Sequence, residues 1–135
     1  MAQLWIASER GDARAVAALL DGDCAAVAVN HAGKWGMTPL FVASARGYVD
    51  VVLMLLAKQG VDVNQAENNG ATPLFVASQN GHSEVVSMLL AKQGVDVNQA
   101  MNDGCTPLYI ASQNGHSEVV SMLLAKEGVL SLIHI

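Results

Sequence analysis

Apolar residues recur along this chain at the spacing of short amphipathic helices. Val85, Val86, Leu89 and Leu90 occupy positions i, i+1, i+4 and i+5, which places all four on one side of a helix. Met88 lies beside them and widens the apolar stripe. Because such a stripe must be buried against another element, the pattern predicts a packed helical protein.

A shorter helix is predicted immediately before this one. Thr72 is a favourable N-cap, and Pro73 suits the first helical position, where a missing N–H has no cost. Leu74–Asn80 then forms about two turns. Gly81 supplies the left-handed residue that commonly follows a helix.

The ends of the longer helix are predicted from the same kinds of signal. Ser83 is expected to be its N-cap, and Gly94 is expected to end it. Lys92 is expected to complement the negative C-terminal end of the helix. Between helix pairs, Asn68-Asn69-Gly70 is a turn signal, which predicts a protruding, hairpin-like loop.

The predicted helix pair recurs at a fixed interval. Thr-Pro-Leu begins at residues 38, 72 and 106, a spacing of 34 residues. Residues 72–95 and 106–129 are identical at 21 of 24 positions, and residues 38–61 and 72–95 at 18 of 24. The chain is therefore a tandem array.

A first unit without the Thr-Pro turn precedes these three. Residues 4–8 match residues 40–44 at an offset of 36, and Asp21–Ala26 makes the following loop two residues longer than its later counterparts. No pair of short helices can bury its own stripe, so the units are expected to stack. We predict one domain, 1–135, with a capping unit at about 2–29, units at 30–63, 64–97 and 98–129, and an atypical tail at 130–135.

These motifs resemble those of the ankyrin-repeat family. The chain carries Gly70-Ala71-Thr72-Pro73-Leu74, then Gly81, Val85-Val86, Leu89-Leu90 and Gly94-Val95-Asp96-Val97-Asn98, and the likeness spans nearly all of residues 2–129. The resemblance implies an all-α solenoid of stacked antiparallel helix pairs with hairpin-like loops. It also implies a protein–protein interaction module, an adaptor or scaffold that binds through its concave face.

The chain departs from the ankyrin pattern at three points, one of which is that Ser44, Ser78 and Ser112 replace the second alanine. The usual period is 33, and the extra residue falls within Leu56–Gly60, where it is expected to lengthen the second helix by one residue. A histidine that normally ties neighbouring repeats is replaced by an aromatic residue, namely Trp5, Phe41, Phe75 and Tyr109 in successive units. Packing between repeats is the main interpretation of this aromatic column, and a partner-facing strip is the alternative.

Composition and charge limit which class of partner and which cellular compartment are expected. The chain is 52% hydrophobic, 14% charged and 4% aromatic, with a formal net charge of −5, which argues against nucleic acid as a partner. The longest apolar run, Val51–Ala57, is too short to cross a membrane. Two cysteines are too few for a disulfide framework, so a cytoplasmic protein is expected, with the nucleus as the alternative. We expect a monomer in isolation.

Candidates for chemistry are few. His82 and His116 occupy one repeat position, which is compatible with a metal site or with a repeated capping or surface histidine; the second interpretation is preferred. Cys105 has no neighbouring histidine or aspartate arranged for nucleophilic catalysis. We therefore predict a protein without catalysis, metal or cofactor.

The resemblance places the contact surface on the loop tips and at the ends of the first helices. Trp35, Arg46 and Tyr48 are residue types that often anchor interfaces, and they distinguish the first full unit from the next. Drift at exposed positions is the alternative explanation for those differences. The predicted protein-binding residues are Lys34, Trp35, Met37, Arg46, Tyr48, Asn68, Asn69, Ala71, Gln79, Asn80, His82, Asn102, Asp103, Cys105, Gln113 and Asn114.

Three further alternatives stay open at this point. Asn64 and Asn98 are similar to sites that an asparaginyl hydroxylase modifies in ankyrin proteins, although loop stabilisation is the preferred role for both. Leu130–Ile135 replaces the expected Asp-Val-Asn and resembles translated sequencing-adapter read-through. In that case the array could be the recruiting segment of a larger enzyme or receptor.

Overall fold

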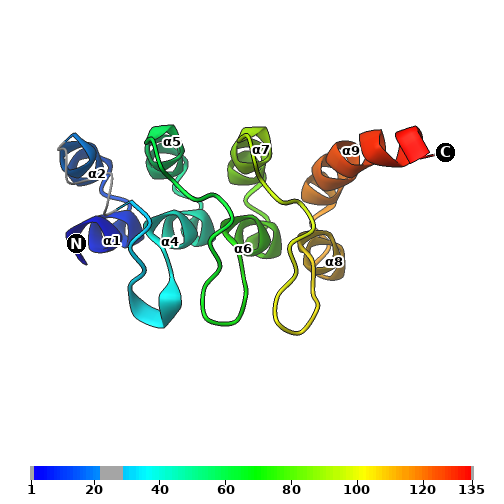
Figure 1. Ribbon diagram of the computed structural model, residues 1–135, viewed down its shortest axis with the longest axis horizontal. Helices are drawn as coiled ribbons and strands as arrows, with labels where there is room; N and C mark the ends of the chain where they lie inside the picture. The colour runs from blue at the N-terminus through cyan, green and yellow to red at the C-terminus, as the bar shows by residue number, and fades with distance from the viewer. Residues whose placement is uncertain (1, 22–28, 135) are drawn as a thin grey trace.

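In the residues that the structure describes, the protein is a row of four helix pairs. The computed structural model describes residues 2–21 and 29–134, and it has eight α-helices and no strand in that part of the chain. The first helix of each pair lies in one row, and the second helix of each pair lies in a parallel row on the other side (Figure 1). The first helices are α1 (Ala2–Arg10), α4 (Pro39–Arg46), α6 (Pro73–Asn80) and α8 (Pro107–Gln113). The second helices are α2 (Ala13–Leu20), α5 (Val49–Ala57), α7 (Ser83–Ala91) and α9 (Ser117–His134). The predicted all-α solenoid is confirmed.

The first helices begin and end as the sequence predicts. The Thr72 hydroxyl accepts a hydrogen bond from the Phe75 N–H at 3.1 Å, and Pro73 is the first residue of α6. Gly81 is left-handed at φ 73°, and its N–H donates to carbonyls of the last helical turn. Thr38 and Thr106 cap α4 and α8 in the same way. Local signals therefore define each first helix.

The second helices depart from the prediction at both ends. His82, not Ser83, is the N-cap of α7, and no side chain caps that helix because the His82 ring contacts the preceding unit instead. The helix ends at Ala91, before Gly94, because Lys92 already has an extended backbone with ψ 129°. In the preceding unit α5 likewise ends at Ala57, so only the first two residues of Leu56–Gly60, the segment expected to hold the extra residue, are helical.

Lysines at these turns join successive second helices. The Lys92 Nζ donates to the carbonyl of Leu56 at 2.9 Å, and the Lys58 Nζ donates to the carbonyl of Leu20 at 2.9 Å. Lys92 thus interacts with the negative end of α5 in the preceding unit, not with its own helix as predicted. This difference makes the lysine a link between units.

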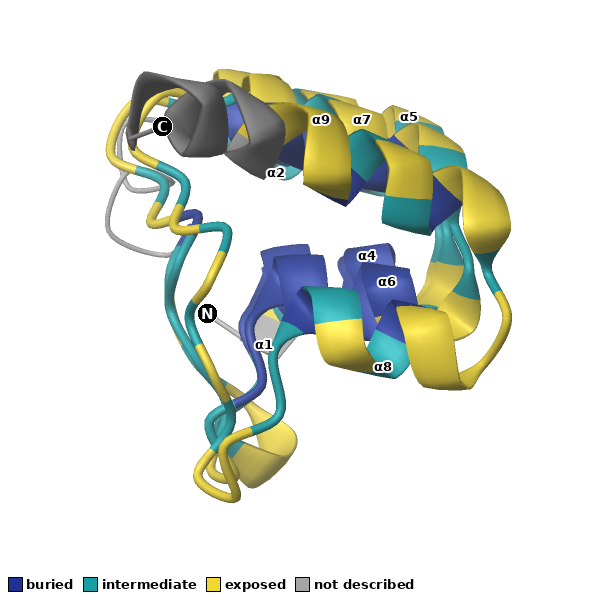
Figure 2. Cartoon of the chain, turned by 90° about the vertical axis from the view of Figure 1, so that its right-hand side faces the viewer, coloured by how far each residue is buried: buried dark blue, intermediate teal, exposed yellow. Residues whose placement is uncertain are grey.

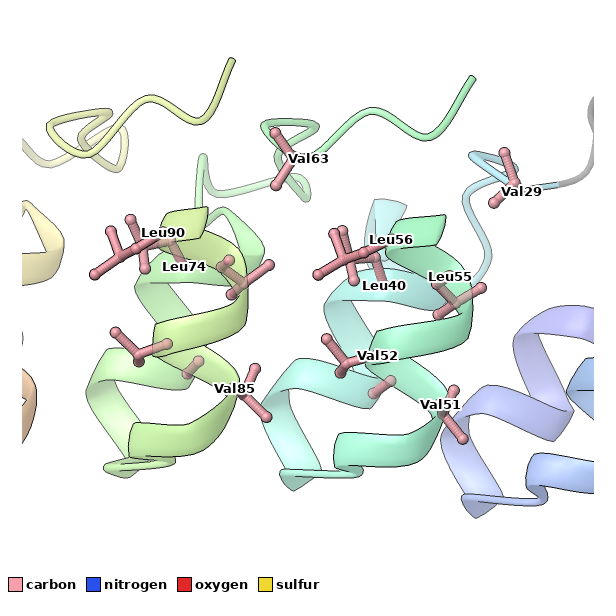
Figure 3. Close-up of a cluster of buried hydrophobic side chains, with 14 of the residues drawn as sticks. Val29, Leu40, Val51, Val52, Leu55, Leu56, Val63, Leu74, Val85 and Leu90 are labelled. Atoms are coloured by element: carbon pink, nitrogen blue, oxygen red, sulfur yellow. The ribbon is translucent and has the colours of Figure 1, made fainter. Parts of the chain in front are cut away.

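The main hydrophobic core lies between the two rows of helices. The predicted stripe is confirmed, since Val85, Val86 and Leu89 are fully buried and Leu90 is buried. Val51 and Val85 lie in the seams between neighbouring units (Figure 3). Each unit therefore buries its apolar stripe against its neighbours as well as within its own helix pair.

Three loops protrude from the row on the side of the first helices (Figure 1). Main-chain hydrogen bonds join their tips: the Asn68 N–H donates to the Trp35 carbonyl at 3.0 Å, and the Asn102 N–H donates to the Asn69 carbonyl at 2.9 Å. The short 3₁₀ helix η1 (Lys34–Gly36) forms the first tip. The loops are thus held in register with one another.

The last helix differs from its counterparts. Whereas α5 and α7 end at Ala57 and Ala91, α9 continues through Gly128 to His134. The proposed tail at 130–135 is therefore helical up to His134. The longer first loop, predicted at Asp21–Ala26, lies almost entirely outside the described residues, as does Cys24.

Candidate functional site

A cleft of about 620 Å³ opens where the loops meet the first helices. The loops descend beside α1, α4, α6 and α8, on the side away from the second helices (Figure 2). Side chains from the first three units and from all three loops line the cleft: Trp5, Glu9, Lys34, Trp35, Met37, Phe41, Val42, Ala45, Arg46, Glu67, Ala71, Phe75, Val76, Gln79 and Met101. Its volume is in the range of ligand-binding clefts in proteins.

The floor of the cleft is apolar and separate from the main core. Phe41, Val42, Ala71, Phe75 and Val76 form a second hydrophobic cluster, which we call the inner cluster. All five are at least nine-tenths buried. Both phenylalanines of the chain belong to it, and both tryptophans line the same cleft.

Trp35 stands on the rim in an unusual conformation. Its φ is 62°, and among the described residues it is the only non-glycine with a positive φ. The side chain is 62% exposed, and the Lys34 Nζ lies 5.8 Å from the centroid of its ring. A left-handed backbone is costly for a bulky residue and often marks a functional position.

The remaining charged groups of the cleft have partners within the protein. A nitrogen of the Arg46 guanidinium lies 3.8 Å from a carboxylate oxygen of Glu9. The Glu67 carboxylate accepts hydrogen bonds from the N–H groups of Asn69 at 2.7 Å and Ala71 at 2.9 Å. Glu67 therefore fixes its own loop from within.

The repeat family is shown by comparison with family models. Models described as "Ankyrin repeats (3 copies)" and "Ankyrin repeats (many copies)" match residues 59–131 and residues 23–74. The chain belongs to the ankyrin-repeat family. No curated protein matches it. Ankyrin repeats are generally modules for protein–protein interaction and are typically non-catalytic.

The ankyrin fold brings part of the predicted contact surface together. Lys34, Trp35, Met37, Arg46, Ala71 and Gln79 all line the cleft. Ala71 is buried in the inner cluster and exposes only 6% of its surface, so it offers little to a partner. Away from the cleft, the predicted residues that are exposed are Asn68, Asn69, Asn80, Asn102, Asp103, Gln113 and Asn114.

Several predicted contact residues instead hold neighbouring ankyrin units together. The Asn80 amide donates to the Ala45 carbonyl at 2.8 Å, and a ring nitrogen of His82 lies 3.0 Å from the same oxygen. Asn114 and His116 repeat this arrangement at the Gln79 carbonyl. In the described part of the chain, no three histidine, cysteine, aspartate or glutamate side chains could hold a metal ion. The repeated histidines are thus ties between units.

Tyr48 is also a packing residue in the ankyrin array. It is half-buried against the main core, and its ring lies so close to Gly11 that an added Cβ there would be 3.0 Å away. Truncating Tyr48 would therefore remove packing within the array, whether or not a partner also contacts this residue.

Asp103 and Cys105 form a local pair beside the third loop tip. The Asp103 carboxylate accepts a hydrogen bond from the Cys105 N–H at 3.0 Å, and this bond is the main reason that the pKa of Asp103 is lowered. The hydrogen bond between the two side chains raises the pKa of the Cys105 thiol. A raised pKa leaves less thiolate at neutral pH, which makes this cysteine a poor nucleophile.

The aromatic column serves mainly as packing between ankyrin units. Phe41 and Phe75 are buried, whereas Tyr109 is 54% exposed at the last unit. Trp5 is half-buried, and its indole N–H donates to the Met37 carbonyl at 2.8 Å, which ties the first unit to the first loop. The preferred interpretation is confirmed for the two phenylalanines.

Sequence reasoning did not place much of the cleft lining in the site. The sequence points to Trp5, Phe41 and Phe75 only through the alternative of a partner-facing strip, and it does not point to Glu9, Val42, Ala45, Glu67, Val76 and Met101. The regular aromatic column was the one available signal, because it runs along the first helices from which the cleft is built.

None of the helices in the described residues is long and apolar enough to span a membrane.

Proposed function

We propose that this ankyrin array is an adaptor that binds a partner protein through the cleft, with Trp35 as the main anchor. One observation carries the proposal: a large aromatic side chain is 62% exposed on a left-handed backbone at the rim of a cleft that spans several units. Exposed aromatic residues at the edge of an apolar pocket are typical interface hot spots. No catalytic step is proposed for this surface.

A rigid scaffold favours this kind of binding. The helix ends are joined across units by Asn80 and His82, and the loop tips by main-chain hydrogen bonds. Side chains on such a scaffold lose little conformational entropy when a partner binds. The array therefore presents Trp35 in a position that is set before association.

The test is affinity capture with the whole chain as bait, followed by mass spectrometry and measurement of the dissociation constant for each recovered partner. We expect Trp35→Ala to weaken binding of the cognate partner by about tenfold or more, as for a hot-spot aromatic. Leu53→Ala is the matched control, because Leu53 is also a large apolar residue, 59% exposed, but lies on α5 in the other row of helices.

The two variants together test whether the partner binds in the cleft. A partner that Leu53→Ala retains and Trp35→Ala loses supports the proposal. A partner that binds both variants as tightly as the wild-type chain overturns it. Loss with Leu53→Ala alone would assign binding to the second helices and would also overturn it.

A further inference from the structure

The formal charges of the side chains around the cleft sum to zero, and this bears on the chemistry of its occupant. Arg46 pairs with Glu9, Glu67 accepts two N–H groups of its own loop, and Lys34 lies over the Trp35 ring. These side chains carry two positive and two negative formal charges, although the whole chain has a net charge of −5. The cleft is thus electrically balanced on an acidic protein.

The uncharged surface that remains is apolar and adaptable. Trp5, Met37 and Met101 are half-buried against the inner cluster, so each exposes part of its side chain toward the cleft. Methionine is flexible and polarizable, and it adjusts to side chains of different shape. Binding to such a surface is favoured most when an apolar group of the partner is buried on it, and a charged group adds little to the free energy of binding.

We infer that the occupant of the cleft is a bulky uncharged side chain of the partner, such as leucine, methionine or phenylalanine. This inference rests on the proposed function and adds the chemistry of the contact to it. An acidic segment would compete with Glu9 for Arg46, and a cationic group would compete with Lys34 for the face of Trp35. A charged partner group would therefore have to replace either the Arg46–Glu9 ion pair or the Lys34–Trp35 contact.

The probe is a phage-displayed library of random heptapeptides, selected on the whole chain. We expect the selected peptides to share one large apolar residue and to have no fixed charged residue. Synthetic versions are then titrated by tryptophan fluorescence, which reports on this cleft because both tryptophans of the chain line it. Screening by salt weakens contacts between exposed charges, so we expect the dissociation constant to change less than about twofold between low and physiological salt.

Charged peptides and chain variants complete the test. Replacing the shared apolar residue of a selected peptide by aspartate or by lysine is expected to weaken binding about tenfold or more, in line with the loss of a buried apolar side chain. Met101→Ser is expected to weaken binding, whereas Leu53→Ser, on the other row of helices, is expected to leave it unchanged. Urea unfolding curves check that both variants are folded, and Trp35→Ala replaces Met101→Ser if that variant is not.

Several results would overturn the inference. A fixed acidic or basic residue among the selected peptides would do so, as would binding that weakens steeply with salt. Failure to select any peptide, or equal binding by Met101→Ser, Trp35→Ala and the wild-type chain, would also do so. The proposed function survives these results if partner capture still depends on Trp35, and it fails separately if capture does not.

Discussion

Trp35 occupies a turn position that its own backbone disfavours. The equivalent residues of the next two loops are Asn69 and Asp103, and neither has a positive φ, whereas Trp35 has φ 62° and is followed by the left-handed Gly36. A left-handed conformation costs an ordinary residue about 1–2 kcal/mol, and asparagine tolerates it better than most. Stability alone therefore does not explain a tryptophan at this position.

Trp35→Asn should separate stability from recognition. We expect the free energy of unfolding to rise by about 1 kcal/mol, because the relief of strain exceeds the roughly 0.5 kcal/mol of an exposed cation–π contact with Lys34. Partner binding should fall about tenfold or more. Urea unfolding and a binding titration measure the two effects. Trp35→Ala is the control, since it removes the ring but lacks the short polar side chain with which asparagine tolerates a left-handed backbone. An equal gain in stability for that variant would contradict the explanation.

Buried serines form a second feature at this scale. The hydroxyls of Ser8, Ser44 and Ser78 have no hydrogen-bond partner within the described part of the chain, and all three residues are fully buried. Ser112 occupies the equivalent position in the last unit, where it is exposed at the end of the row. A buried hydroxyl that has lost water and gained no partner costs stability.

Ser78→Ala should stabilise the protein. Removing a buried, unsatisfied hydroxyl is expected to raise the free energy of unfolding by about 1 kcal/mol, with almost no change in packing volume. Ser112→Ala provides the comparison, because its hydroxyl is already solvated, and it should change stability by less than about 0.5 kcal/mol. Chemical denaturation of both variants measures the difference. Destabilisation by Ser78→Ala would mean that the hydroxyl has a partner, such as bound water.

At the level of the helices, the turns after α1, α4 and α6 also receive a side chain from the next unit. A Cβ added at Gly81 would lie 2.6 Å from the Nδ1 atom of His116, and one added at Gly47 would lie 2.7 Å from that of His82. Both glycines are left-handed C-caps. The same glycine thus ends a helix and makes room for the histidine that ties the following unit to that helix.

Gly81→Ala and Gly115→Ala allow these two roles to be measured apart. Gly115 has almost the same φ, 76° against 73°, but nothing within 4 Å of an added Cβ. We expect Gly115→Ala to lower the free energy of unfolding by about 1 kcal/mol from backbone strain alone. Gly81→Ala should cost at least about 1 kcal/mol more, because the His116 ring must move. Equal losses in thermal or urea unfolding would show that the crowding is relieved without cost.

Across the whole molecule, stability depends on contacts between neighbours in the row. The helix α7 packs against both α5 and α9, and its Leu89 is fully buried in the core that they share. No unit has a core that is closed on its own. A destabilising substitution in an inner unit should therefore lower the free energy of unfolding of the entire array.

Leu89→Ala tests this dependence. Truncation of a fully buried leucine is expected to cost about 2–5 kcal/mol, and we expect the array still to unfold in a single transition. Leu53→Ala, which removes a mostly exposed side chain from α5, should cost less than about 0.5 kcal/mol. Unfolding followed by circular dichroism and by tryptophan fluorescence gives both answers. Two separate transitions would mean that the units on either side of α7 unfold independently.

The fold could be predicted from the sequence because its signals are local and repeated. Thr72, Pro73 and Gly81 define α6 through contacts within a few residues, and the 34-residue period then transfers that result to the other units. The ends of the second helices could not be predicted in this way. There, Lys92 and His82 use their side chains on the preceding unit, and such contacts have no local pattern.

The contact surface was harder to predict than the fold. Trp35, Lys34 and Arg46 were recognised because they are conspicuous residue types in loops and at helix ends. Phe41 and Phe75 were assigned to packing and do pack, yet their edges also line the cleft. A repeat period tells which residues are equivalent, but the depth of the cleft depends on how the loops and first helices meet in space.

The hydrogen bonds between loop tips have a consequence for how this surface can change. The bonds from Asn68 to Trp35 and from Asn102 to Asn69 join main-chain atoms, so they do not depend on which side chains the tips carry. A point substitution at one tip can alter what is recognised there while the path of the adjoining tip is preserved. New specificities can thus be acquired one loop at a time on helices that keep a common sequence, which makes the array a natural template for diversification and for design.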